Sequence, residues 1–335
     1  MPTALTFDLL RLLSDAQFQS GPALARRLGV SRAGLRSALR DLDTIGVELA
    51  RDPHHGYRLA APIDWLDAAQ IKAGLGPHAV LYDLRLLDMT ASTNTTLLEN
   101  AAGMPSGTVV IAELQTAGRG RRGRGWHTGL GGALTFSVLW RFEQGAGVLA
   151  GLGPAVGVAL VRALRELGAT EALLKWPNDV LVRHQKIAGT LVEIQGEVLG
   201  PSLAVIGIGI NCRLDPATRQ RIDQAVTDLA SVGVHAPRNH VLAAVLSHLA
   251  VVLMEFSAQG FAPLRKEWES FHVYAGKRVA LRLPDGSFEQ GIAAGVSDDG
   301  ALLLQTNTGL RRFHSGEVSL RPLSGAGEPR TASGG

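Results

Sequence analysis

The feature that most constrains this chain is residues 118–126, a loop with the sequence GRGRRGRGW. Glycines let backbone N–H groups approach an anion closely, and the guanidinium groups between them offer forked donors suited to phosphate or carboxylate oxygens. An arginine–glycine run can also be a flexible RNA-binding segment. Here, however, apolar β-forming runs precede the loop at residues 108–112 and follow it at 133–140. The loop is therefore predicted to connect two strands inside a packed domain and to bind an anion there.

Composition places the chain among globular proteins of more than one domain. It has 335 residues, of which 46% are hydrophobic and 19% charged, and this length suggests two or three domains. A formal net charge of +3 is too small to require a nucleic-acid partner for the whole chain, although a local basic face is compatible with one. The single cysteine, Cys212, excludes an internal disulfide framework and is expected to be a small core residue.

Neither a targeting signal nor a membrane span is predicted. The N-terminus lacks the basic flank and the small-residue cleavage site of a secretory signal. The longest uncharged run, residues 145–161, is rich in glycine, is interrupted by Pro154, and is too short and too weakly apolar for a span. We therefore expect a cytoplasmic protein with no membrane association.

The first sixty residues predict three short helices followed by a β-hairpin. Ser20 is placed to cap a helix at residues 22–28, and Ser31 is placed to cap a third helix that Gly46 ends. Two short strands, 47–50 and 57–59, then form a wing. This order is typical of a winged helix-turn-helix, although a solvated arginine face on an interaction domain is the alternative. The predicted DNA contacts are Ser31, Arg32, Arg36 and Arg40.

Between residues 81 and 257, strands and helices are mixed without the regular alternation of a doubly wound fold. Ser92, Thr93 and Asn94 begin a helix predicted at 95–102, where their polar groups could serve only as caps. Pro177 cannot donate to a strand ladder, so residues 175–179 are expected to interrupt a strand with a turn. The other predicted elements are a connecting helix at 63–72, a long helix at 148–167, a hairpin of 180–182 with 187–194, a strand at 203–210, an irregular and mobile segment at 213–238, and a helix at 241–256.

Beyond residue 270, five short strands recur about every ten residues and predict a small β-barrel. They cover residues 279–283, 287–292, 301–305, 310–313 and 318–320. The last residues, 324–335, are rich in glycine and serine and are expected to be a disordered tail.

Four motifs converge on one family. Residues 118–123 (GRGRRG), 175–179 (KWPND) and 186–189 (KIAG), with Ser92-Thr93-Asn94 and Gln115 upstream, resemble the signature of biotin protein ligases. The resemblance covers nearly the whole chain, because a winged helix before the catalytic domain and an SH3-like barrel after it are the layout of the bifunctional ligases that also repress the biotin operon. It implies an α+β fold with a winged helix-turn-helix at 1–61, a mixed α/β catalytic domain of the biotin/lipoate ligase type at 62–270, an SH3-like β-barrel at 271–323 and a disordered tail at 324–335.

The resemblance implies a two-step acyl transfer. The biotin carboxylate attacks the α-phosphorus of ATP to give biotinyl-5′-AMP, and a lysine of a biotin carboxyl carrier protein then takes the biotinyl group. The first step brings two anions together, so cations and backbone donors must screen them. The residues implied for catalysis are Lys186, Arg119 and Arg121; for biotin, Ser92, Thr93, Asn94, Gln115, Arg119, Gly120, Arg121 and Lys186; for the adenylate, Arg122, Trp126, Asn178, Asp179 and Asn211; and for Mg²⁺, Asp179.

Simpler interpretations exist for some of these residues. Lys186 could be a surface turn lysine, Trp126 a buried core tryptophan, and Asn178 with Asp179 a purely structural turn. Two positions also depart from the pattern of repressor-type relatives. Val226 stands where such a ligase carries an adenine-stacking tryptophan, and the wing turn has His54-His55 where relatives often have glycine and lysine.

The partners that the resemblance implies are a biotin carboxyl carrier protein, operator DNA, and a second copy of the chain once biotinyl-adenylate is bound. Two other functions stay open. A lipoate–protein ligase shares the catalytic fold but usually lacks the arginine–glycine loop and the winged helix. A DNA-binding biotin sensor without ligase activity would not need Arg119, Arg121 and Lys186.

Overall fold

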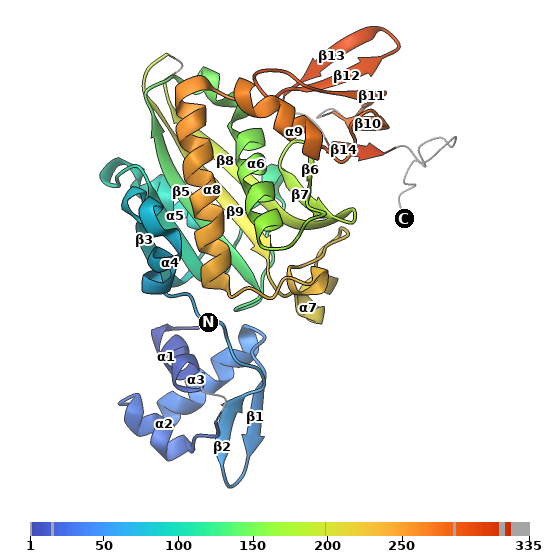
Figure 1. Cartoon of the computed structure of the whole chain (residues 1–335). Helices are drawn as coiled ribbons and strands as arrows, with labels where there is room; N and C mark the ends of the chain where they lie inside the picture. The colour runs from blue at the N-terminus through green and yellow to red at the C-terminus, as the bar shows by residue number, and fades with distance from the viewer. Residues whose placement is uncertain (1, 15–16, 198, 284–285, 315–318, 323–335) are drawn as a thin grey trace.

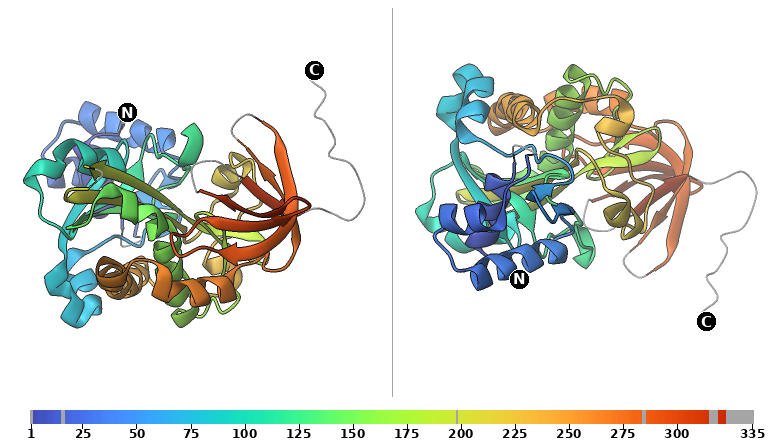
Figure 2. Two further views of the ribbon diagram at one scale, coloured as in Figure 1. Left: turned by 90° about the horizontal axis from the view of Figure 1, so that it is seen from above. Right: turned by 90° about the horizontal axis from the view of Figure 1, so that it is seen from below.

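The computed structural model describes residues 2–14, 17–197, 199–283, 286–314 and 319–322. Figure 1 shows a small helical unit at the N-terminus, a central layer of helices packed on a sheet, and a smaller sheet near the C-terminus. The N-terminal unit and the C-terminal sheet lie at different ends of the central layer (Figures 1 and 2).

The N-terminal unit is the predicted winged helix-turn-helix. Ser20 and Ser31 accept hydrogen bonds from the backbone N–H groups of Ala23 and Gly34 and so cap the second and third helices, as the sequence predicts. The third helix buries the apolar face that its periodicity predicts. The elements are α1 (Ala4–Leu12), α2 (Gly21–Arg27), α3 (Arg32–Thr44), β1 (Leu49–Asp52) and β2 (Gly56–Leu59), so the first wing strand begins two residues later than predicted.

The connection to the central domain corrects one prediction. A helix is expected at residues 63–72, but the structure has a helix, α4, only at Ala68–Leu75. The preceding backbone is held by side chains from distant elements: Leu66 N donates to Glu113 Oε1 at 2.8 Å, and Asn239 binds the backbone of both neighbours of Leu66. These bonds take the place of intrahelical ones, and the helix therefore starts after them.

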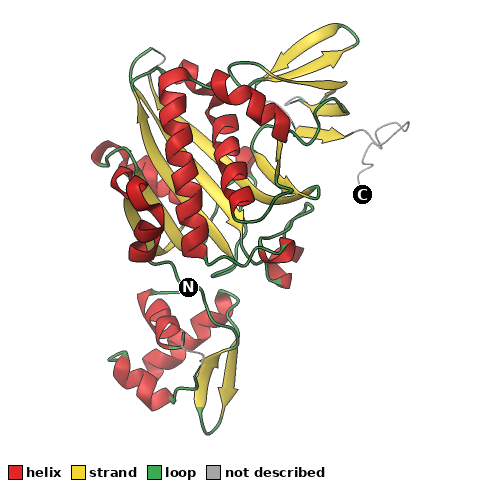
Figure 3. Cartoon of the chain, viewed as in Figure 1, coloured by secondary structure: helices red, strands yellow, loops and turns green. Residues whose placement is uncertain are grey.

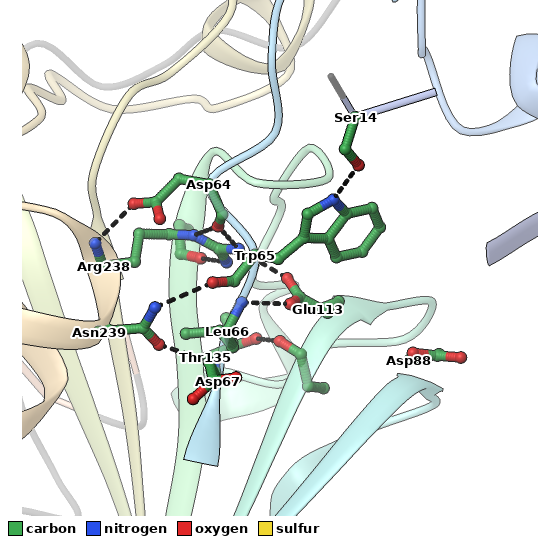
Figure 4. A network of polar contacts seen from close by, with 12 residues as sticks. Ser14, Asp64, Trp65, Leu66, Asp67, Asp88, Glu113, Thr135, Arg238 and Asn239 are labelled. Carbon is green, nitrogen blue, oxygen red and sulfur yellow. Dashed lines mark hydrogen bonds and ion pairs between the residues drawn. The ribbon is translucent and has the colours of Figure 1, made fainter. Parts of the chain in front are cut away.

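A buried ion pair holds the same connection (Figure 4). Arg238 donates through Nη2 to Glu113 Oε2 at 2.7 Å, and the two side chains are only 3% and 5% exposed. Arg238 Nε also donates to Asp64 O at 2.8 Å. On the other side, the Trp65 indole donates to Ser14 Oγ of the winged unit at 2.7 Å. The connecting residues are thus bound both to the central domain and to the winged unit.

The central sheet has seven strands in the order β3-β4-β5-β9-β8-β7-β6, in which β3 and β4 are parallel and the other described pairs antiparallel. Helices α6 (Leu152–Glu166) and α8 (Arg238–Gln259) cover one face, and α5 (Thr93–Asn100) lies on the other (Figures 1 and 3). The strands are β3 (Asp83–Thr90), β4 (Thr108–Gln115), β5 (Ala133–Phe142), β6 (Leu173–Lys175), β7 (Asp179–Val182), β8 (Gln185–Gly196) and β9 (Ser202–Asn211).

Strand β5 shows how the sequence makes the two faces different. Leu134, Phe136 and Val138 join the core under α6 and α8. Because strand residues alternate between faces, Thr135 and Ser137 point to the side of α5. That face of the sheet therefore carries polar groups among apolar ones.

The two most apolar helical stretches belong to this core. Residues Ala146–Glu166 and Arg238–Gln259 are long and apolar enough to cross a membrane, but 72% and 56% of their most apolar windows are buried inside the protein. The helix predicted at 148–167 is therefore confirmed, with its first turn formed by a 3-10 helix, Ala146–Gly151. Helix α8 begins three residues earlier than predicted, α5 begins two residues earlier, and the segment 213–238 contains a short helix, α7 (Pro216–Gln220).

The C-terminal domain is an antiparallel sheet of five strands in the order β13-β12-β11-β10-β14. It follows α9 (Arg265–Phe271) and shares apolar residues with the central core. The indole of Trp176, from the KWPND turn, donates to Gly300 O at 3.1 Å and so joins the two domains. The strands are β10 (Arg278–Arg282), β11 (Phe288–Val296), β12 (Leu302–Thr306), β13 (Gly309–Phe313) and β14 (Ser319–Pro322); the predicted tail, 324–335, lies outside the described residues.

Candidate active site

A pocket lies on the face of the central sheet that α5 borders. Its floor comes from β5, β8 and β9, and its walls come from the start of α5 and the arginine–glycine loop. Ten of the sequence-predicted site residues line it, namely Ser92, Thr93, Asn94, Gln115, Arg119, Gly120, Arg121, Trp126, Asn178 and Lys186. Residues up to 94 positions apart in the sequence are thereby brought into one cavity.

One end of the pocket is a network of neutral polar groups. Gln115 Oε1 accepts from Thr93 N at 2.8 Å and from Thr93 Oγ1 at 3.2 Å. Thr93 Oγ1 is 2.6 Å from Ser137 Oγ, which donates to Asn94 Oδ1 at 2.5 Å. Within the described part of the chain, Gln115 Nε2 has no hydrogen-bond partner. This end can therefore recognise a neutral ligand group that both donates and accepts.

Glycines on three strand positions make room for the pocket. Gly209 pairs with Thr135 on one side and with Gly189 on the other, and Gly207 pairs with Ser137 on the next row. A Cβ at Gly209 would lie 2.3 Å from Trp126 Cε2, and one at Gly207 would lie 2.1 Å from Asn94 Oδ1. Gly207 and Gly209 are not among the residues predicted for the site. Their signal is the spacing of two in an otherwise apolar strand, which places both glycines on one face.

The arginine–glycine loop closes on itself beside this floor. Gly120 N donates to Arg124 O at 2.7 Å, and Trp126 N donates to Gly118 O at 2.8 Å. Arg122 has a φ of 57°, so this turn is built on a left-handed residue. Trp126 lines the pocket and is only partly buried, which favours a ligand contact over a purely structural core role.

Cations gather at the other end of the pocket. Lys186 Nζ lies 2.6 Å from Asp179 Oδ1 and 5.5 Å from the centre of the Trp126 ring, and the Lys186 side chain is 15% exposed. Arg121 Nη1 donates to Asn178 Oδ1 at 3.3 Å. Burial and, to a smaller extent, the neighbouring charge of Arg122 lower the pKa of Arg121, and Asp179 opposes this shift. A partly buried pair of cations of this kind suits an anionic ligand.

Arg119 is tied to the sheet at the rim. Its Nη2 donates to Glu193 Oε2 at 2.8 Å, and the same oxygen accepts from Asn94 Nδ2 at 2.7 Å. Glu193 is absent from the sequence-predicted site. It follows the KIAG motif by several residues, and its period-two position relative to Gly189 and Leu191 places it on the pocket face.

Three predicted adenylate residues, Arg122, Asp179 and Asn211, are not among the described residues that line the pocket. Asp179 instead pairs with Lys186. Asn211 Nδ2 donates to Thr227 O at 3.0 Å. Asp179 therefore contacts a residue that lines the pocket, and Asn211 binds the backbone of the segment that packs against Lys186.

The segment after Asn211, predicted to be mobile, packs against Lys186 in this structure. Lys186 N donates to Ala225 O at 2.9 Å, and Thr227 N donates to Lys186 O at 3.0 Å. Val226, between them, is 6% exposed. Val226 thus forms an isolated parallel β-bridge with Lys186.

Comparisons with known proteins find matches to all three parts of the chain. A model of the biotin/lipoate A/B protein ligase family matches residues 86–211, one of the biotin protein ligase C-terminal domain matches 274–321, and one of a helix-turn-helix domain matches 6–58. The bifunctional ligase/repressor BirA of Escherichia coli is 36% identical over 93% of this chain and 96% of its own length. BirA of Bacillus subtilis is 32% identical over 96% of this chain and 100% of its own length.

The chain belongs to the bifunctional biotin ligase and repressor family. A solved structure of the biotin protein ligase from Aquifex aeolicus in complex with biotin and ATP is also similar, with a TM-score of 0.61 and 32% identity over 72% of this chain and 99% of that one. The predicted family and the three-part fold class are confirmed. The lipoate-ligase alternative is not favoured, because a similar relative from Mycobacterium tuberculosis and the Aquifex aeolicus structure are named as biotin ligases, and residues 6–58 of this chain match a helix-turn-helix domain.

The winged unit of this ligase–repressor presents the predicted arginine face. Arg32, Arg36 and Arg40 are exposed on α3, whereas Ser31 uses its hydroxyl to cap the helix. In the wing, Asp52 Oδ1 accepts from the backbone N–H groups of both histidines of the turn, and these bonds lower the pKa of Asp52. The wing is thus ordered by its own acidic residue.

Among the described residues of this ligase–repressor, no three His, Cys, Asp or Glu side chains gather to hold a metal ion. Asp179, the predicted Mg²⁺ ligand, has its Oδ1 2.6 Å from Lys186 Nζ. These residues do not fit a resident metal site. A divalent ion can instead be bound mainly by nucleotide phosphates and accompany ATP as part of the substrate.

Proposed function

We propose that this protein activates biotin with ATP to form biotinyl-5′-AMP and transfers the biotinyl group to a lysine of a biotin carboxyl carrier protein. The observation that carries the proposal is one pocket with a neutral hydrogen-bonding end at Gln115 and Thr93 and a cationic end at Arg121 and Lys186. Biotin has a matching division, since its ureido ring is neutral and its carboxylate is charged.

In the first step, a carboxylate oxygen of biotin forms a bond to the α-phosphorus of ATP, and the bond to the pyrophosphate oxygen breaks. Lys186 and Arg121 place positive charge where the carboxylate and the phosphate meet, and this charge matters most as the pentavalent phosphorus forms. Asp179, paired with Lys186, orients the lysine. Gly118 and Gly120 let the loop backbone come close to the phosphate.

In the second step, a neutral lysine amine of the carrier protein attacks the biotinyl carbonyl carbon, AMP leaves, and the amine loses a proton. Until then the mixed anhydride must be kept from water. Trp126 and the arginine–glycine loop form the wall of the pocket that can exclude it. We propose Mg²⁺, bound mainly by the nucleotide phosphates, as the ion that accompanies ATP, and the cytoplasm as the compartment in which the protein meets biotin and ATP.

The experiment that tests this activity is incubation of the pure protein with ATP, Mg²⁺ and either biotin or lipoate. Pyrophosphate release and the mass of the adenylate are measured in each case. We expect biotinyl-adenylate with biotin and little product with lipoate. Product with lipoate alone would contradict the proposal, and no adenylate with either acid would leave a sensor without ligase activity.

We also propose that the winged unit binds operator DNA and that repression responds to biotin. A single winged domain reads a short half-site, so effective operator binding requires two copies of the chain. If biotinyl-adenylate favours the dimer, linkage makes operator occupancy depend on biotin. The support for the DNA contact is the row of exposed arginines on α3, Arg32, Arg36 and Arg40.

Fluorescence anisotropy with DNA from upstream of the organism's own biotin genes tests this second role, with and without biotin and ATP. Replacing Arg32, Arg36 and Arg40 by alanine should weaken binding and flatten its salt dependence. A matched control replaces Arg221, Arg278 and Arg282, which are exposed arginines of the other domains. Equal losses of operator affinity in both triple variants would mean that net charge, and not the α3 arginines, determines binding. Operator affinity that is the same with and without biotin and ATP would refute the coupling between biotin and repression.

A further inference from the structure

A continuous chain of hydrogen-bonded side chains crosses the pocket. It starts at Gln115, which accepts from Thr93, and continues from Thr93 Oγ1 to Ser137 Oγ at 2.6 Å. Ser137 donates to Asn94 Oδ1 at 2.5 Å, and Asn94 Nδ2 donates to Glu193 Oε2 at 2.7 Å. The neutral end of the pocket is thus connected to a carboxylate on β8.

The same Glu193 oxygen connects this chain to the arginine–glycine loop. It accepts from Arg119 Nη2 at 2.8 Å. Arg119 has no second hydrogen-bond partner among the described residues, so most of its guanidinium donors remain open to a ligand. The Arg119 side chain is 42% exposed and the Glu193 side chain 27%, which places the contact at the rim of the pocket.

Glu193 is held firmly from the side of the sheet. Asn94 is 4% exposed, and its two amide N–H groups donate to Glu193 and to Leu191 O. Gly207 leaves the space that Asn94 fills, because a Cβ there would lie 2.1 Å from Asn94 Oδ1. The carboxylate therefore has a fixed anchor on one side and the loop arginine on the other.

The position of Glu193 is unfavourable for the proposed reaction by charge alone. The pocket is proposed to bring the biotin carboxylate and the ATP triphosphate together, and the Glu193 carboxylate repels both. Pairing with Arg119 offsets part of that repulsion. The remaining benefit is geometric: a guanidinium with one nitrogen fixed loses less side-chain freedom when the other nitrogens bind a ligand.

We propose that Glu193 is a positioning residue for adenylate formation, which orients Arg119 toward the reacting anions and is itself oriented by Asn94. This inference rests on the proposed ligase function. It gives Asn94 a different role from the one that its motif predicts, because both of its N–H groups are already used within the protein. Asn94 then supports Glu193, and biotin is recognised by the neighbouring polar groups.

The test is Glu193→Gln, which keeps the size of the side chain and an acceptor for Asn94 but removes the charge opposite Arg119. We expect kcat for pyrophosphate release to fall roughly tenfold while biotin affinity changes less than about twofold, because the orientation of Arg119 matters most when charge develops in the transition state. The melting temperature should stay at the parent value. A lower KM for biotin with an unchanged kcat would mean that Glu193 only repels the substrate, and this result would overturn the proposal.

Two controls isolate the effect. Glu289→Gln removes a carboxylate from the Arg311–Glu289 pair of the C-terminal sheet, whose exposures of 45% and 28% match those of the Arg119–Glu193 pair. This control should leave kcat unchanged. In an Arg119→Gln background, Glu193→Gln should reduce kcat by less than about twofold further, because the residue acts through Arg119.

The outcomes also separate this inference from the function on which it rests. If the parent protein releases no biotin-dependent pyrophosphate, the proposed ligase function fails. If the parent is active and Glu193→Gln has the same kcat, or if the tenfold loss persists without Arg119, only the role of Glu193 is refuted.

Discussion

The buried ion pair between Glu113 and Arg238 allows a stability prediction that can be worked from the structure. Glu113→Ala leaves the Arg238 guanidinium, in a side chain only 3% exposed, without its carboxylate. It also removes the acceptor of Leu66 N. Breaking one side of a buried ion pair costs about 3–5 kcal/mol. Because Arg238 keeps its bonds to two backbone oxygens, Asp64 O and Ala133 O, we expect a loss at the lower end, about 3 kcal/mol.

Urea unfolding followed by tryptophan fluorescence measures this loss. With a slope of about 2–3 kcal/mol per molar urea, the midpoint of the transition of the central domain should fall by roughly 1–1.5 M. Glu113→Gln keeps a neutral acceptor for both donors and should cost less, about 1–2 kcal/mol. Glu289→Ala is the control, since it breaks an ion pair that is much more exposed and should cost no more than about 1 kcal/mol.

Equal midpoints for Glu113→Ala and Glu289→Ala would refute the reasoning, because burial would then have no effect on the cost of the unpaired charge. A second consequence concerns the winged unit. The backbone that Glu113 binds continues into Trp65, which is hydrogen-bonded to Ser14 of that unit. Operator affinity should therefore fall in Glu113→Ala by a larger factor than the rate of adenylate formation.

Three further predictions follow from single groups. Lys186→Ala should slow pyrophosphate release by roughly a hundredfold or more but weaken biotin binding far less, and equal losses would make the lysine only a ground-state contact. Burial, with a smaller effect of Lys277, lowers the pKa of His272 from 6.5 to about 4. Between these pH values the unfolded chain binds more protons than the folded one. The contribution of His272 to the free energy of unfolding is therefore fully present above pH 6.5, and up to about 3 kcal/mol of it is lost as the pH falls toward 4. In urea unfolding at a series of pH values, the midpoint of His272→Phe should fall less than that of the parent over this range. Desolvation of the half-buried Cys212 raises the pKa of its thiol to about 12, so alkylation by iodoacetamide at pH 8 should be at least roughly a hundredfold slower than in urea, and similar rates would contradict the raised pKa.

The parts of the site that could be predicted from the sequence are those with a local signal. The arginine–glycine loop, the hairpin lysine and the polar start of α5 all carry their chemistry in short motifs, and the pocket brings them together. The winged helix was predictable for the same reason, because helix caps and apolar periodicity are read within a few residues.

The parts that could not be predicted depend on register between distant strands. Glu193 reaches Asn94 across 99 positions, and Ser137 reaches it across 43. Neither residue belongs to a motif, so only the pairing of β5, β9 and β8 reveals their contact. The wrong helix at 63–72 has a similar cause, since the backbone of its first half is bound by Glu113 and Asn239, far along the chain.

The glycines of β9 provide the last prediction. A methyl group at Gly209 would lie 2.3 Å from Trp126 Cε2 and 2.4 Å from Cζ2, whereas carbon atoms pack at about 3.5–4.0 Å. The strand cannot give way, because β9 is paired along its length with β5 on one side and β8 on the other. In Gly209→Ala the indole must therefore move by about 1 Å or more away from the pocket floor.

Overpacking of this kind costs about 1–3 kcal/mol, and because Trp126 is only partly buried, we expect the indole to move and most of the cost to appear as weaker ligand binding. The KM for biotin should rise roughly tenfold to a hundredfold, and the tryptophan emission should shift on mutation. Gly103→Ala is the matched control, since a methyl group there meets no atom within 4 Å. A Gly209→Ala protein with parental KM and emission would show that the floor tolerates a side chain, and the glycine spacing would then have no role in shaping the biotin pocket.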